Sequence, residues 1–113
     1  MSKINFDEKG LIPAVVQDAD TGDVLMLGYM NAESLRRTLV EKEVWFYSRG
    51  RQELWHKGST SGNKLKLVSI SVNCEENSLL VKAHPMGPTC HTGHKTCFYR
   101  ELDKNGKILS SKL

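Results

Sequence analysis

Short runs of apolar and β-branched residues, separated by turn residues, dominate the chain. Asp18–Asp23, which contains Gly22, lies between the first two runs and is typical of a turn. Residues 11–29 are therefore predicted to form a β-hairpin. Residues 66–72 alternate between two faces, with Val68, Ile70 and Val72 on one of them. Each run has the length of a strand, and together the runs predict strands at 11–17, 24–29, 44–48, 66–72 and 79–81.

One segment has the signals of a helix. Asn31 is a good N-cap, and Glu33 would lie in the positive first turn. Leu35 and Leu39, four residues apart, would share one face of a helix that ends at about Glu41. These signals predict one main α-helix near residues 32–41.

The remaining segments are loops and turns. Residues 49–64 are polar, basic and rich in glycine, which predicts a functional loop that includes a short strand near Leu54 and Trp55. Pro85, Gly87 and Pro88 should break the chain, and Asn105-Gly106 predicts a second hairpin, between 98–102 and 108–109. The predicted fold class is mainly β with one main helix, in a single domain over residues 1–113.

Composition sets the class of protein. The 113 residues are 39% hydrophobic and 26% charged, which is typical of a globular domain and excludes a disordered chain. The longest apolar run, residues 24–30, is too short to span a bilayer. The first eight residues mix acidic and basic groups, unlike a secretory leader. We therefore expect a cytoplasmic protein with no membrane partner.

The charge is concentrated in the middle of the chain. The net charge is +3, whereas residues 45–66 carry five basic residues against Glu53 alone, a local balance of +4. Such a segment favours an anionic partner, either nucleic acid or a phosphorylated small molecule. The alternative is a solvated loop that only aids solubility. No Walker-type phosphate loop is present, and Trp45 and Trp55 are more typical of a core than of base-stacking platforms.

Three cysteines suggest metal chemistry. Cys90 and Cys97 enclose His91 and His94, and Cys74 lies sixteen residues before Cys90. Zinc binds thiolate and imidazole, and three cysteines would leave an open catalytic position. His91 or His94 would instead close a structural site. From residue types alone, three unconnected buried thiols are an equal alternative.

Several blocks of the sequence resemble those of the phosphoribosyl-AMP cyclohydrolase family, in the same order. The resemblance extends from about Leu11 to Phe98. It is most specific in the last two blocks, Thr60-Ser61-Gly62 and residues 87–93, and it also includes residues 11–18, 24–31 and 48–58.

The resemblance implies a hydrolase that opens the adenine ring of phosphoribosyl-AMP between N1 and C6, the third step of histidine biosynthesis. It implies a β pseudobarrel of mixed strands that intertwines with a second copy in a homodimer, with the metal site near the subunit interface. The family's zinc ligands match Cys74, Cys90 and Cys97, with one Zn²⁺ per subunit. Zinc would generate a nucleophile from water at neutral pH, and His91 is the candidate proton carrier, with His94 as the alternative.

The basic loop would supply donors for the two 5′-phosphates of such a substrate. Its cationic, hydroxyl and glycine positions suit anion binding. The predicted substrate-binding residues are Arg49, Arg51, Trp55, Lys57, Thr60, Ser61 and Gly62.

One block departs from the family. Where the family has three aspartates that hold Mg²⁺ around the first cysteine, this chain has Asn73, Glu75 and Asn77. The formal charge at these positions is −1 instead of −3, and Mg²⁺ prefers carboxylate oxygen. Magnesium either binds more weakly here, or gains help from Glu76 or substrate phosphates, or is no longer used.

Two other functions would use the same features. The first is a zinc-stapled dimer that binds a phosphorylated nucleotide without turnover, which the altered 73–77 run would allow. The second is a small zinc module that binds nucleic acid. The net charge of +3 provides too little clustered basic surface for the second, so no nucleic-acid partner is expected.

Overall fold

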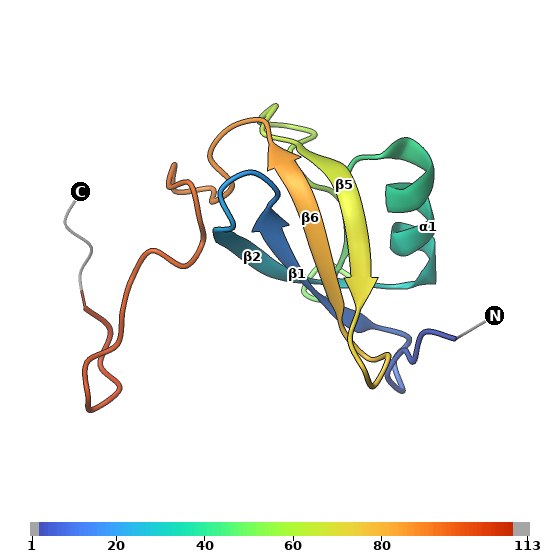
Figure 1. Cartoon of the computed structure of the whole chain (residues 1–113), viewed down its shortest axis with the longest axis horizontal. Coiled ribbons are helices and arrows are strands. Elements are labelled where there is room, and N and C mark those ends of the chain that lie inside the picture. The colour runs from blue at the N-terminus through green and yellow to red at the C-terminus, as the bar shows by residue number, and fades with distance from the viewer. Residues whose placement is uncertain (1–2, 110–113) are drawn as a thin grey trace.

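The computed structural model describes residues 3–109, which form a mixed four-stranded sheet, a two-stranded hairpin and one helix (Figure 1). The sheet has the order β2-β1-β6-β5, in which β1 pairs antiparallel with β2 and parallel with β6, while β5 and β6 are antiparallel. The hairpin consists of β3 and β4. The elements are β1 (Ile12–Asp18), β2 (Val24–Met30), α1 (Ala32–Glu41), β3 (Trp45–Ser48), β4 (Glu53–His56), β5 (Leu65–Val72) and β6 (Leu79–Pro85).

The first hairpin follows from a strict alternation in β1. Ile12, Ala14 and Val16 are fully buried, and the residues between them are only partly covered. Asp18 closes the turn that follows, because its carboxylate accepts from the backbone N–H groups of Asp20 at 2.8 Å and Thr21 at 3.2 Å. The turn chemistry therefore fixes where β1 ends and β2 begins.

Helix α1 begins and ends at well-formed caps. The Asn31 side chain accepts from the Ser34 backbone N–H at 2.8 Å, and the Ser34 hydroxyl accepts from the Asn31 N–H at 2.9 Å. Lys42 ends the helix in the left-handed region, with φ 62°. The buried Thr38 hydroxyl accepts from the Trp45 N–H at 2.9 Å, which joins the helix to β3.

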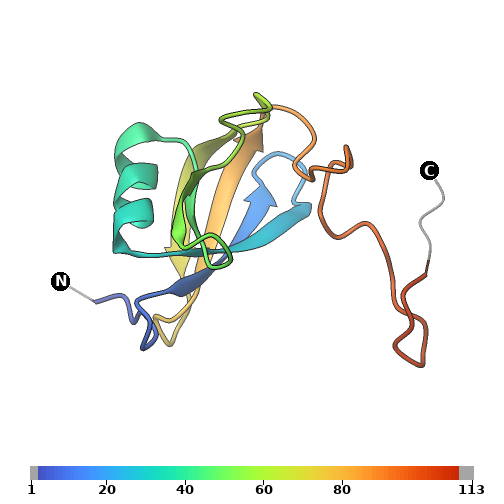
Figure 2. The same cartoon turned by 180° about the vertical axis from the view of Figure 1, so that it is seen from behind.

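The core lies between the sheet and the layer formed by α1 and the β3–β4 hairpin, which cover one face of the sheet (Figure 2). Phe46 and Val44 are buried against apolar residues of β1, β2 and β6. Phe46 packs directly on Gly28, where an added Cβ would meet the ring at 2.7 Å. Glycine is required there by this close approach rather than by its dihedral angles.

The predicted elements are confirmed in their main outline. The mainly β fold, the helix over 32–41 and a short strand at Leu54 and Trp55 all occur. The parallel pairing of β1 with β6 was not predicted. Strand β6 also continues through Pro85, where the sequence predicted a break.

Two local predictions need correction. A bulge between Leu67 and Ser69 interrupts the expected alternation, so that Leu67 and Ile70 both pack on the core while Val68 is exposed. The second hairpin is reduced to a turn at Gly106 with one bridge between Leu102 and Ile108. Within residues 3–109, no helix has both the length and the apolar character needed to cross a membrane.

Candidate functional site

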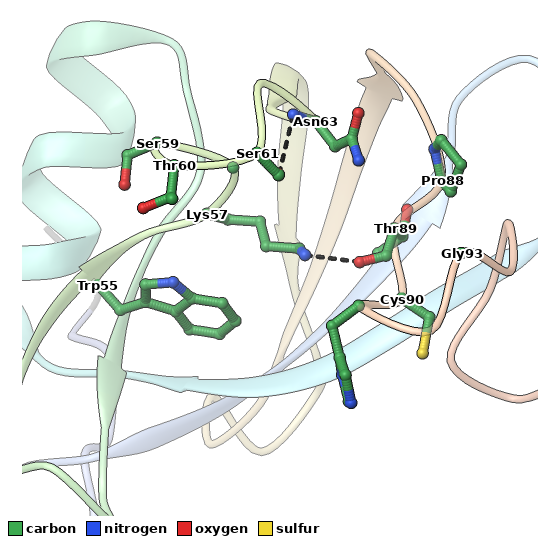
Figure 3. A pocket seen from close by; sticks show the side chains of 12 residues that line it. Trp55, Lys57, Ser59, Thr60, Ser61, Asn63, Pro88, Thr89, Cys90 and Gly93 are labelled. Carbon is green, nitrogen blue, oxygen red and sulfur yellow. Dashed lines mark hydrogen bonds between the residues drawn. The ribbon is translucent and has the colours of Figure 1, made fainter.

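A cavity of about 300 Å³ lies between the loop after β4 and the segment after β6 (Figure 3). We call it the Cys90 cavity. Trp55 and Lys57 contribute from β4 and its end, and Cys90 and His91 contribute from the other side. The 59–61 hydroxyl residues line its rim. The cavity therefore unites the basic loop and the cysteine-histidine segment, which the sequence singled out separately.

The glycines of this region allow backbone segments to approach closely. Gly58 has φ +82°, and an added Cβ would collide with the backbone of Asn63. An added Cβ on Gly87 would collide with the Asn63 side chain. The 58–63 loop thus folds tightly on itself and rests on the segment that leads to Cys90.

Lys57 is buried and joins the two sides of the cavity. Its Nζ donates to the backbone carbonyl of Thr89 at 2.5 Å and lies 5.5 Å from the centre of the Trp55 ring. The neighbouring Thr89 hydroxyl is buried without a hydrogen-bond partner among the described residues. Lys57 therefore holds the segment that carries Cys90, and its ammonium group already donates a hydrogen bond to a backbone carbonyl.

Cys90, which lines the cavity, interacts with the thiol of Cys97. The Thr92 hydroxyl donates to Cys90 Sγ at 3.0 Å, and this hydrogen bond lowers the pKa of the Cys90 thiol. Partial desolvation, followed by the adjacent Cys90 sulfur, raises the pKa of the Cys97 thiol, even though the residue as a whole is exposed. Two interacting thiols with a hydroxyl donor suit a soft metal such as zinc.

The third predicted ligand, Cys74, lies elsewhere in the same chain. It is exposed in the turn between β5 and β6, and Cys90 follows the opposite end of β6 (Figure 1). The seven residues of β6 separate the two positions by about 20 Å at 3.3 Å per residue. The structure thus brings together two of the three predicted zinc ligands within one chain.

The predicted magnesium residues form a turn closed by their own amides. Asn73 Oδ1 accepts from the backbone N–H groups of Asn77 and Ser78 at 2.9 Å each. Asn73 Nδ2 donates to Asn77 Oδ1 at 2.7 Å, and Asn77 Nδ2 lies 3.5 Å from a Glu75 oxygen. With Glu75 as the only carboxylate among the three, this donor set does not fit a Mg²⁺ site.

A second cavity, of about 670 Å³, lies on the other side of Trp55. We call it the Arg49 cavity. The Arg49 guanidinium lies over the Tyr29 ring, 3.9 Å from its centre, and Lys9 lines the same cavity. Of the other predicted phosphate-binding residues, Arg51 and Gly62 line neither cavity, whereas Thr60 and Ser61 line the Cys90 cavity.

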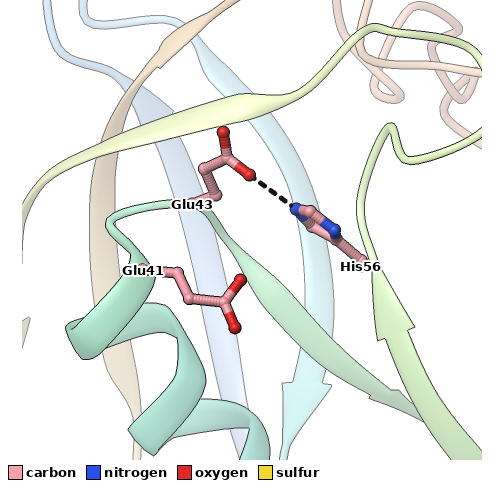
Figure 4. Close-up of side chains that lie close together, drawn as sticks. All are labelled: Glu41, Glu43 and His56. Carbon is pink, nitrogen blue, oxygen red and sulfur yellow. Dashed lines mark hydrogen bonds and ion pairs between the residues drawn. The ribbon is translucent and has the colours of Figure 1, made fainter.

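A further cluster, which the sequence did not indicate, lies at the end of α1 (Figure 4). Glu41, Glu43 and His56 place one potential metal-ligand atom each within 4.8 Å of one another, the only such group found among residues 3–109. His56 Nε2 lies 2.9 Å from Glu43 Oε1, and Glu41 accepts from the Trp45 indole at 2.9 Å. These atoms already have protein partners, and His56 also stacks on Trp45 at 4.4 Å.

No sequence signal could have found this cluster, because it depends on strand register. Trp45 pairs with His56 across the β3–β4 hairpin, and this pairing brings His56 to the end of the helix. The three residues are dispersed over sixteen positions in a pattern that matches no metal motif.

Comparison with known proteins identifies the family. The family model of phosphoribosyl-AMP cyclohydrolase matches residues 26–99. The chain is 56% identical over 94 residues to the phosphoribosyl-AMP cyclohydrolase of Lactiplantibacillus plantarum. These aligned residues are 83% of this chain and 87% of the relative. It is 50% identical over 103 residues to that of Clostridium botulinum, covering 90% of this chain and 94% of the relative.

A longer relative matches in part. The histidine biosynthesis bifunctional protein HisIE of Oceanobacillus iheyensis is 55% identical over 106 residues, which are 94% of this chain. The chain spans about half the length of that relative, 49%. The residues matched by the family model, 26–99, include the whole lining of the Cys90 cavity, the cysteine-histidine segment, and all of the lining of the Arg49 cavity except Lys9. The chain therefore belongs to the phosphoribosyl-AMP cyclohydrolase family of hydrolases.

Proposed function

We propose that this chain hydrolyses the N1–C6 bond of the adenine ring of phosphoribosyl-AMP, in the third step of histidine biosynthesis. The observation that carries the proposal is the Cys90 cavity. It places Cys90 and His91 against a loop of hydroxyl and N–H donors, in a chain that belongs to a family named for this reaction. The product is the phosphoribosyl formimino intermediate with an opened ring.

We assign zinc to Cys74, Cys90 and Cys97, with the thiols supplied by two subunits. Cys90 and Cys97 are close enough to influence each other's pKa, whereas Cys74 is at the far end of β6. A second copy can bring its own Cys74 turn to the Cys90 cavity, whereas the same chain cannot. The proposal is therefore a homodimer with two shared sites.

Features of the chain's surface and sheets support the dimer and the pseudobarrel. Large apolar side chains are exposed in the segment that follows Cys97, including Phe98 at 58% and Leu102 at 64%. Such side chains are costly to leave in water. Backbone hydrogen bonds from Val44 to Leu65 and from Leu67 to Lys42 link the hairpin layer to β5, as barrel closure requires.

The residues of the Cys90 cavity have different proposed roles in the reaction. Zinc bound by the thiolates would supply Lewis-acid activation of water at neutral pH. His91 is exposed at the cavity and has no hydrogen-bond partner among the described residues, so its ring is available to move a proton. His94 is less suited, because its Nδ1 bonds to Thr92 at 2.8 Å and its ring stacks on Tyr99.

The overall reaction balances with water alone. Water adds its oxygen to C6, which becomes the carboxamide carbonyl, and the N1–C6 bond breaks. One proton of the water goes to the exocyclic nitrogen on C6, which becomes the carboxamide amino group, and N1 receives the other. His91 would carry that proton, and Lys57 would hold the Thr89-Cys90 segment in place during the step. Magnesium has no step in this proposal, because the 73–77 turn does not fit it. The cytoplasmic location stays a prediction.

The test is turnover of authentic phosphoribosyl-AMP, followed by the absorbance of the opened product, together with zinc content per chain. Cys90→Ser should lose both bound zinc and turnover. His56→Gln is the matched control, because it removes the imidazole of the Glu41-Glu43-His56 cluster and should keep the zinc. Retained zinc in Cys90→Ser with loss in His56→Gln would place the metal in that cluster instead.

The same assay separates the alternative function. A zinc-stapled dimer that only binds a phosphorylated nucleotide would hold zinc and bind the substrate without forming product. The amide-closed turn at 73–77 is the observation that favours this alternative.

A further inference from the structure

Trp55 stands between two cavities whose linings differ in chemistry. Among residues 3–109, it alone lines both the Cys90 cavity and the Arg49 cavity. We propose that the two 5′-phosphates of the substrate bind in separate cavities, with the purine at Trp55 between them. The phosphate of the N9-linked ribose binds at Arg49 and Lys9, and that of the N1-linked ribose binds at the 59–61 rim. This inference rests on the proposed function.

The position of Trp55 suits a platform for a purine ring. It pairs with Phe46 in the hairpin, and the two rings pack at 5.6 Å with a tilt of 37°. The residue is nonetheless 38% exposed. One part of the indole is thus fixed by the core, and the rest is open for stacking, which tolerates any base.

The Arg49 cavity has the charge for one phosphate. Arg49 and Lys9 contribute two cations, and none of the described Asp or Glu residues lines the cavity. The Tyr29 ring supports the Arg49 guanidinium at 3.9 Å, which fixes its plane while its edge stays free for a bidentate contact. Arg51 lies two residues away but outside the cavity, so it contributes only long-range electrostatic attraction for the phosphate.

The Cys90 cavity binds the other phosphate with different groups. The backbone N–H groups of Thr60 and Ser61 donate to no acceptor among the described residues, and the loop adds three hydroxyls at 59–61. Gly58, with φ +82°, sets the curvature that exposes these N–H groups. Lys57 adds positive charge nearby but is already bonded to the Thr89 carbonyl.

The geometry of the substrate decides which phosphate binds where. C6 is bonded directly to N1, so the N1-linked ribose is the one adjacent to the reacting carbon. The groups assigned to the reaction, Cys90 and His91, line the same cavity as the 59–61 rim. The N9-linked ribose is attached at the opposite side of the purine, so its phosphate extends past Trp55 into the Arg49 cavity.

The assignment predicts which variants weaken the binding of AMP. This nucleotide carries the N9-linked phosphate alone. Arg49→Ala should weaken AMP binding about tenfold or more, because a charge-assisted phosphate contact is lost. Arg51→Ala, the matched control, removes an identical charge from outside the cavity and should leave affinity within about twofold. Thr60→Glu, which adds a carboxylate at the exposed rim, should leave AMP binding unchanged but raise the KM for phosphoribosyl-AMP about tenfold.

Binding is measured by calorimetry, and the fold of each variant is checked by circular dichroism. Lys9→Ala, at an exposed position, is a second probe of the Arg49 cavity and should act like Arg49→Ala. AMP affinity that falls in Thr60→Glu and stays unchanged in both cation variants would overturn the assignment, as would a parent that binds no AMP. If instead AMP binding depends on Arg49 but phosphoribosyl-AMP is not turned over, the proposed function fails and the separate phosphate site stands.

Discussion

Lys57 illustrates how a side chain that was predicted to bind phosphate can form a contact within the protein instead. The sequence predicted it as a phosphate ligand, because it is basic and lies next to glycine. In the structure it is buried, with its ammonium on the Thr89 carbonyl. An ammonium in a poorly solvated place needs such a partner, so its charge stabilises the Cys90 segment instead of meeting solvent.

Gly58 is the residue on which the 58–63 loop depends. We expect Gly58→Ala to reduce the free energy of unfolding by about 1–3 kcal/mol, because φ +82° is strained for alanine and the added methyl meets the Asn63 backbone. Gly50→Ala is the matched control, since a Cβ at Gly50 meets nothing within 4 Å and its φ is not in the left-handed region. Urea denaturation of both variants compares them. Equal losses would mean that the loop adapts freely at residue 58.

At the scale of elements, local chemistry explains what could be predicted. Alternation gives β1, and the Asn31 cap gives the start of α1. The parallel pairing of β1 with β6 connects residues more than sixty positions apart, which no local pattern encodes.

The candidate site was likewise predictable only where it depends on neighbouring residues in the sequence. The cysteine-histidine segment is visible as a cluster of residue types, whereas the two cavities on either side of Trp55 appear only once the hairpin packs against the sheet.

The β5–β6 turn provides an element-scale prediction about magnesium. Replacing Asn73 and Asn77 with Asp changes the charge at positions 73, 75 and 77 from −1 to −3. It also removes the amide contact between the two side chains. Without magnesium, repulsion should lower the melting temperature of the double variant below that of the parent. Added Mg²⁺ should restore it, because three carboxylates now match the ion's preferred ligands.

The measurement is a thermal melt at several Mg²⁺ concentrations, with zinc retained. The parent should show little response, because its turn is already closed by amides. A parent that is stabilised by Mg²⁺ as strongly as the double variant would mean that the turn opens to bind the ion.

At the scale of the whole molecule, the residues of the proposed zinc site lie in two distant parts of the chain. The 86–97 segment and the β5–β6 turn lie at opposite ends of the sheet, and each carries part of the predicted zinc site (Figure 1). The segment 98–109 extends from the body with exposed apolar side chains. In the proposed homodimer, a second copy would cover this surface and complete both sites at once.

Subunit mixing tests this shared site directly. Cys74→Ser and Cys90→Ser should each be inactive and low in zinc, because each damages both sites of its homodimer. In a heterodimer of the two variants, one site combines both substitutions and the other combines Cys74 of one subunit with Cys90 and Cys97 of its partner. Refolding the variants together in equal amounts makes about half of the dimers mixed, each with one intact site, so about a quarter of the parent activity and zinc should return.

If all three thiols came from one chain, every site would contain one damaged thiol in any mixture, and neither activity nor zinc would return. Mixing Cys90→Ser with Cys97→Ser is the matched control, because both substitutions affect the same side of the site and no combination of these subunits restores it.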